Sequence, residues 1–124
     1  MNQSLIVGDL LTRPKLLGLV EHYGVWLGFN RVATNTPDMG EHVTSLEDFA
    51  AGQRVKVQRT GANPMSVALN AQRVLANPKK YDPVTRNCEH TASEIIRGVP
   101  RSGQLLLIAA ALLLLVALFR LSRS

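Results

Sequence analysis

Hydrophobic and polar residues follow two different spacings along this chain of 124 residues. In the first half, short runs of Val, Ile, Leu and aromatic residues are separated by Gly, Pro and Asn, which is typical of strands joined by turns. The pattern predicts strands over residues 6–11, 21–28, 31–34 and 54–59, with a break at 13–15 and a loop at 35–40. The second half changes to helical spacing.

Helices are predicted over residues 46–51, 65–76 and 87–97. Asn63 and Pro64 supply a cap and a first residue for the second of these, and Gly98 ends the third. The order of strands and helices predicts an α+β domain in which a small antiparallel sheet carries helices packed on one side.

Strand 21–28 carries a histidine at its start. Alternation along a strand places His22, Gly24, Trp26 and Gly28 on one face. The two glycines leave room on the face of His22 for another backbone or a helix to approach.

An unbroken apolar run covers residues 105–119, without charge, Pro or Gly. As a helix it spans about 22 Å, and its flanking residues extend it toward the length that a bilayer requires. We therefore divide the chain into a domain at 1–103 and a single transmembrane anchor at 104–121, with the domain expected on the cytoplasmic side. A buried or oligomer-forming hydrophobic helix is the alternative.

The composition narrows the classes of function. A formal charge of +5 suits an anionic membrane surface or nucleic acid, but the basic residues are scattered and only 5% of residues are aromatic. We therefore expect no nucleic-acid partner. One cysteine excludes an internal disulfide and a cysteine-based zinc site. The first residues lack the basic start of a secretory signal, so none is expected.

That cysteine, Cys88, lies in the segment Asn87-Cys88-Glu89-His90 at the start of a predicted helix. Unpaired N–H groups and the positive end of the helix dipole stabilise a thiolate there, and the thiolate is the reactive form of cysteine. The sequence position alone is equally compatible with a small buried thiol.

Two segments together resemble a known family. "HYGVWLG" at residues 22–28 is similar to the histidine strand of lecithin:retinol acyltransferase-like proteins, and "NCEH" at 87–90, followed by "GVPRSGQ" at 98–104, resembles their cysteine segment. That family is the circularly permuted branch of the NlpC-type papain-like fold, and its membrane-anchored members are phospholipid acyltransferases. The resemblance covers residues 5–119 and includes the order of histidine before cysteine.

The resemblance implies that Cys88 is a nucleophile and His22 its base, in acyl transfer through a thioester, with no metal or organic cofactor. It also implies a phospholipid membrane and an acyl-lipid substrate as partners, while acceptor and oligomeric state stay open. Family members commonly carry a third polar residue, often histidine, on the following strand. That strand has no histidine here, so Thr34, Asn35 or, from the loop beyond, His42 is the candidate.

Two rival functions are compatible with the same residues. The wider NlpC-type fold includes peptidases and amidases, so Cys88 and His22 are also suited to cleaving a peptide or isopeptide bond. A tail-anchored adaptor that keeps the fold with a weakened site is the second rival, and the missing histidine near Thr34 supports it.

Overall fold

The alternating segments of the first half form one five-stranded antiparallel sheet in the computed structural model, which describes residues 4–123. The strands are β1 (Leu10–Lys15), β2 (Val20–Gly28), β3 (Arg31–Thr36), β4 (Gly40–Thr44) and β5 (Lys56–Gln58). They lie in the order β4-β3-β2-β1-β5. Residues 1–3, which belong to the predicted domain and to the segment assessed for a signal sequence, lie outside the described residues.

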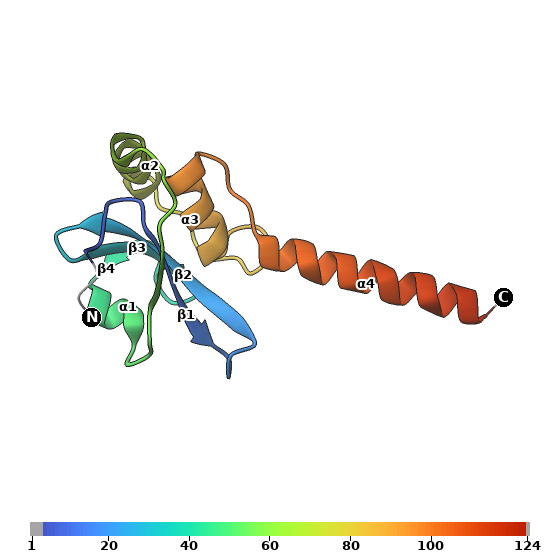
Figure 1. Ribbon diagram of the computed structural model, residues 1–124. Helices are drawn as coiled ribbons and strands as arrows, with labels where there is room; N and C mark the ends of the chain where they lie inside the picture. Colours follow the sequence, from blue (N-terminus) through green and yellow to red (C-terminus); the bar gives the residue numbers. More distant parts are fainter. Residues whose placement is uncertain (1–3, 124) are drawn as a thin grey trace.

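Helices cover both faces of the sheet (Figure 1). On one face, α2 (Pro64–Ala76) and α3 (Cys88–Arg97) pack on β2 and β3. On the other face, α1 (Leu46–Ala50) inserts Phe49 into a second buried cluster with Leu11 and Val32. The α+β class predicted from the sequence is confirmed, but the expectation that the helices share one side is wrong, because β2 buries side chains on both faces.

Two strand predictions need correction: the one over 54–59, where β5 covers only Lys56–Gln58, and that of the first strand. Strand β1 begins four residues later than predicted, because Asp9 closes a turn by accepting the N–H of Ile6 at 2.8 Å. Strand β1 also continues through Pro14, which pairs with Glu21 of β2. On its other side β1 pairs with β5 only over residues 10–12, so Pro14 lies at a free edge. A proline is tolerated at such a free edge because no neighbouring strand needs its N–H.

The predicted loop at 35–40 is shorter than expected, because β3 reaches Thr36 and β4 starts at Gly40. Strand β4 was missed because its sequence, Gly40 to Thr44, carries acidic and polar residues typical of a surface. Glu41 in this strand is nevertheless buried, because the guanidinium of Arg86, 45 positions later, donates a hydrogen bond to its carboxylate.

The helix starts and stops follow local signals. Asn63 caps α2 by accepting the N–H of Ser66, and Pro64 is the first helical residue. Asn87 caps α3, and Gly98 ends it in a left-handed conformation with φ of 79°. These features match the predicted boundaries because each depends on residues a few positions apart.

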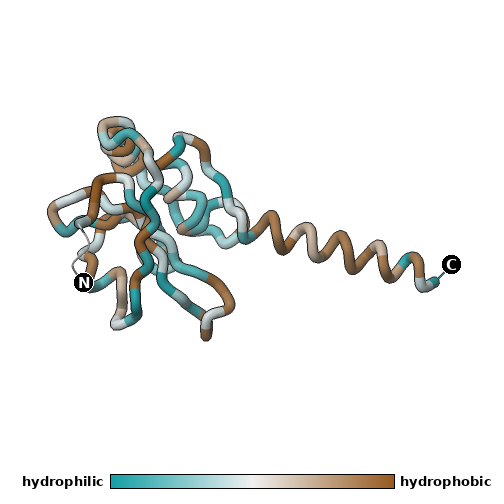
Figure 2. Tube along the Cα trace, viewed as in Figure 1, coloured by the Kyte–Doolittle hydropathy of each residue, from teal (hydrophilic) through white to brown (hydrophobic). Residues whose placement is uncertain are grey.

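Helix α4 (Gly103–Ser122) extends away from the domain (Figure 1), and its surface is apolar along most of its length (Figure 2). None of its described side chains is buried, and an 18-residue window has a mean hydropathy of 2.6. By length and composition, α4 is able to cross a membrane; it is the one such helix among residues 4–123.

The sheet opens where the candidate residues lie. Strands β2 and β3 pair with each other no further than Val25 and Ala33. Before Val25, β2 pairs only with β1, and after Ala33, β3 pairs only with β4. His22 lies on the separated stretch of β2 and Thr34 on that of β3.

Candidate functional site

The first turn of α3 is built around Cys88. The side-chain oxygen of Asn87 accepts hydrogen bonds from the N–H groups of Glu89 and His90, at 2.9 and 3.1 Å. In return, His90 Nδ1 accepts the N–H of Asn87 at 3.1 Å. Among the N–H groups of residues 88–90, that of Cys88 alone has no acceptor within the described chain. It is therefore free to donate to a ligand oxygen at the positive end of the helix.

The sulfur of Cys88 lies next to a cation. Its side chain is 1% exposed, and Lys15 Nζ approaches Sγ to 3.8 Å from the end of β1. Sequence reasoning missed Lys15, because residues 13–15 were interpreted only as a strand break. No local signal could have found it, since 73 positions separate the two residues.

A buried ionic network fixes the segment that precedes Cys88. Arg86 Nε donates to Glu41 Oε2 at 2.8 Å, and its guanidinium also pairs with Glu94. Asn35 Nδ2 donates to the Arg86 carbonyl at 2.8 Å and to Thr91 Oγ1 at 3.1 Å. Asn35 therefore holds the cysteine segment against β3, and its described hydrogen bonds do not include His22.

His22 is held by Thr34. The histidine is 4% exposed, and its Nε2 lies 3.3 Å from Thr34 Oγ1. The same hydroxyl donates to the Tyr23 carbonyl at the shorter distance of 2.7 Å. A hydroxyl has one proton, so towards His22 it acts as an acceptor and the imidazole carries its proton on Nε2. The lone pair of the neutral ring is then on Nδ1.

Packing fixes the plane of the imidazole. The rings of His22 and Phe49 stack with centroids 5.0 Å apart and planes inclined by 21°. Gly24 makes this possible, because a Cβ there would lie 2.6 Å from Val32 Cγ1 and 2.7 Å from Phe49 Cε1. The room predicted beside His22 is thus occupied by the aromatic ring from α1.

The pKa of His22 is lowered from 6.5 to about 4, mainly by burial and in smaller part by the charges of Arg13, Lys15 and His42. The imidazole is therefore neutral at pH 7. His42 acts on it only through charge, since its own Nδ1 is bonded to the Gly40 carbonyl at 2.7 Å.

The structure thus brings Thr34 into contact with His22 and leaves Asn35 and His42 with other partners. Cys88 Sγ and the His22 imidazole are not hydrogen-bonded to each other within residues 4–123. Lys15 is the residue that interacts with both: its ammonium group contacts the sulfur of Cys88, and its charge lowers the pKa of His22.

Glu89 connects the cysteine helix to α4. Its Oε1 accepts from the Ser102 hydroxyl at 2.7 Å and from the N–H of Gln104 at 3.1 Å. Gln104 Oε1 in turn accepts the N–H of Glu21 at 3.1 Å. The first turn of α4 is therefore bonded to the neighbours of both Cys88 and His22.

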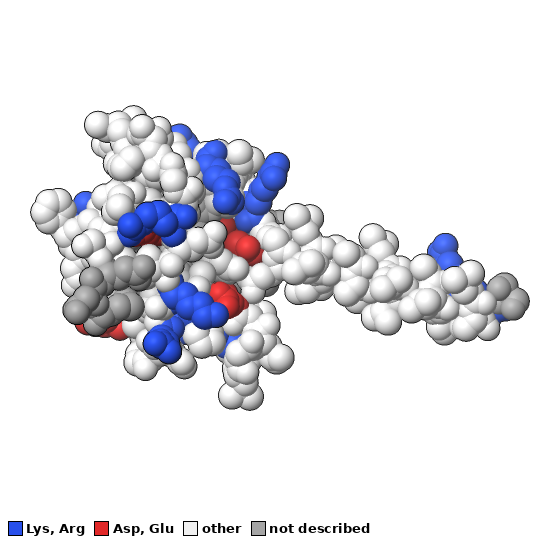
Figure 3. Space-filling model, in the orientation of Figure 1, with Lys and Arg blue, Asp and Glu red and all other residues white. Residues whose placement is uncertain are grey.

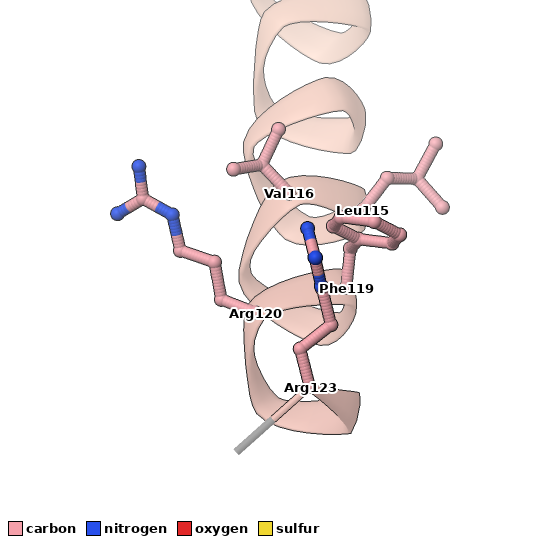
Figure 4. A pocket seen from close by; sticks show the side chains of 5 residues that line it. All are labelled: Leu115, Val116, Phe119, Arg120 and Arg123. Carbon is pink, nitrogen blue, oxygen red and sulfur yellow. The ribbon is translucent and has the colours of Figure 1, made fainter.

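Hollows lie at both ends of α4. One, of about 290 Å³, is at the base of α4 and is lined by residues that include Tyr23, Glu89 and Arg101. The other lies at the far end of the helix, where Figure 4 shows Arg123 beside Phe119; the guanidinium carbon is 5.4 Å from the ring centroid. This second hollow belongs to the surface of a single helix and is remote from Cys88.

The chain matches no protein-family model and no curated protein sequence.

Proposed function

We propose that this protein is a membrane-anchored, cysteine-dependent phospholipid acyl hydrolase or acyltransferase that forms an acyl-thioester on Cys88. The observation that carries the proposal is the position of the sulfur: it lies on the first residue of a capped helix, 3.8 Å from an ammonium group. Both the helix end and Lys15 favour negative charge on the sulfur.

The base in this reaction is His22. With Nε2–H donated to Thr34, Nδ1 is the ring atom that accepts the thiol proton. A pKa of about 4 makes the neutral imidazole a weak base at rest. Stabilisation of the thiolate therefore falls mainly to Lys15 and the helix start.

The reaction proceeds in two stages. The sulfur of Cys88 attacks the ester carbonyl carbon, and the thiol proton passes to His22. The N–H of Cys88 donates to the resulting oxyanion. The carbon–oxygen bond then breaks, and the lysophospholipid oxygen leaves with the proton from His22. In the second stage, water, an amine or a hydroxyl loses a proton to His22 and attacks the thioester, which releases the acyl product and restores the thiol.

The anchor suits such a substrate. Acyl esters lie at the level of lipid headgroups, and a domain tethered by α4 meets them at high effective concentration. Figure 3 shows basic side chains spread over the visible face of the domain, with acidic ones among them beside the base of α4, while the middle of α4 carries no charge; the chain as a whole has a formal charge of +5. This net positive charge favours an anionic headgroup region next to the domain.

The test is the release of fatty acid and lysophospholipid from vesicles that contain the full chain. We expect Cys88→Ala and His22→Gln to abolish release. His42→Gln is the matched control, because this histidine also lies on a strand but bonds only to a backbone carbonyl; it keeps most of the activity. Release that persists in Cys88→Ala would contradict the proposal.

A second candidate function is an anchored binding domain without catalysis. The observation that favours it is the burial of Cys88, which at 1% exposure has little access to a substrate. Failure of a thiol reagent to label Cys88 in the folded protein, together with no lipid turnover, would support this second function.

A further inference from the structure

The turn between β1 and β2 exposes three leucines to solvent. Leu16, Leu17 and Leu19 are 69%, 103% and 84% exposed, and Gly18 lies between them. We call residues 16–19 the leucine tip. Single exposed leucines are common, but three within four residues, each more than two thirds exposed, form an apolar patch of the kind that marks an interaction site.

The backbone of the leucine tip is also unfavourable for leucine. Leu16 and Leu17 adopt φ of 51° and 57°, in the left-handed region. The N–H groups of Gly18 and Leu19 close the turn on the carbonyls of Lys15 and Leu16, both at 3.1 Å. Turn positions with positive φ favour Asn and Gly, because a side chain with a Cβ is strained there. Neither folding nor solubility accounts for leucine at these positions.

The leucine tip lies on the side of the domain from which α4 departs. Glu21, two residues after the tip, donates its N–H to Gln104 Oε1 in the first turn of α4 at 3.1 Å. In Figure 1 the β1–β2 hairpin projects beyond this junction and reaches the level at which α4 leaves the domain. A bilayer that contains α4 would therefore meet the tip.

We propose that the leucine tip inserts into the interface of the bilayer that α4 enters, as a second and peripheral membrane contact. This inference rests on the proposed membrane position of α4 but not on the catalytic role of Cys88. Lys15 and Arg13 lie on the strand next to the tip, and their charges add to the positive potential that phospholipid headgroups meet there, while Lys15 Nζ contacts Cys88 Sγ and Arg13 Nε donates to the Phe49 carbonyl.

Two contacts fix the tilt of the domain, whereas one helix alone leaves it free to rotate. Lys15 adjoins the tip and lies 3.8 Å from Cys88 Sγ. Docking of the tip therefore holds the sulfur close to the level of the headgroups and acyl esters.

Tryptophan fluorescence on vesicles tests this placement. In the full chain, Trp26→Phe removes the native tryptophan and Leu17→Trp places one in the leucine tip. This variant is incorporated into phosphatidylcholine–phosphatidylglycerol vesicles whose brominated acyl chains quench nearby tryptophan. At the depth of about 5–10 Å typical of interfacial segments, we expect a blue-shifted emission and a loss of roughly half of the intensity or more.

Phe29→Trp, in the same background, is the matched control. Phe29 is 93% exposed and has φ of 52°, in the turn at the opposite end of β2. We expect its emission to stay unshifted and unquenched. Quenching that is equal at both positions, or absent at position 17, would overturn the proposal. Protein that does not float with the vesicles would overturn the membrane position of α4 and this inference with it.

A second measurement needs no substitution. Phospholipids with a photoreactive group in the acyl chain are incorporated with the unaltered protein, and the labelled peptides are mapped. Labels on α4 and on residues 16–19, with none on residues 29–31, support the leucine tip as a membrane contact. Labels on α4 alone refute it.

Discussion

Replacing Thr34 with Val removes one oxygen from the buried site and keeps the shape of the side chain. That oxygen serves the Tyr23 carbonyl at 2.7 Å and His22 Nε2 at 3.3 Å. An unsatisfied buried polar group costs about 1–3 kcal/mol. Since two groups lose a partner, we expect the free energy of unfolding to fall by about 2–6 kcal/mol.

Urea unfolding in detergent, followed by the fluorescence of Trp26, measures this loss. Thr34→Ser is the control, because serine keeps the hydroxyl and removes one methyl group, worth about 0.8 kcal/mol. The valine variant should be less stable than the serine variant by at least about 1 kcal/mol. Equal stability of Thr34→Val and the unaltered protein would refute the hydrogen-bond assignment.

The same pair of variants tests the tautomer of His22. Nitrogen-15 NMR distinguishes a proton on Nε2 from one on Nδ1. We expect Nε2–H in the unaltered protein and in Thr34→Ser, and a mixture of tautomers in Thr34→Val. A proton on Nδ1 in the unaltered protein would contradict the proposed base.

Three further variants probe the packing and protonation of the histidine. Gly24→Ala places a Cβ 2.6 Å from Val32 and 2.7 Å from Phe49, so we expect a loss of about 1–3 kcal/mol in thermal unfolding. Gly103→Ala, where the nearest atom is 3.5 Å away, should stay within about 0.5 kcal/mol of the unaltered protein, and equal losses in the two would contradict the packing argument. Because the pKa of His22 is lowered from 6.5 to about 4, the unfolded state binds more protons between these values, and stability falls as the pH drops through them. The pH-dependent loss of unfolding free energy due to this histidine, measured as the difference between the unaltered protein and His22→Gln, is at most about 3 kcal/mol. If the two proteins show the same pH dependence, the imidazole is not buried in the neutral form.

The parts of the fold that depend on neighbouring residues were predictable from the sequence. Helices α2 and α3 begin and end as predicted, because Asn63, Asn87 and Gly98 act within one turn of their own helix. The apolar run likewise identified α4. Strand β4 was not predictable in this way, because the burial of Glu41 depends on Arg86, 45 positions later.

The candidate site shows the same division. Cys88 and His22 were selected from local motifs, and Thr34 was one of three candidates for a third residue. Only the structure separates these candidates, since it bonds Thr34 to His22 and directs Asn35 elsewhere. Lys15 had no local signal, because its role comes from folding the end of β1 against a helix formed much later in the chain.

Intact mass spectrometry of the full chain after mixing with phospholipid vesicles shows whether Cys88 forms a thioester. We expect a mass increase of one acyl group that hydroxylamine removes and that is absent in Cys88→Ala. A protein that releases lysophospholipid without such an adduct, or that carries the adduct in Cys88→Ala, would contradict a thioester on Cys88.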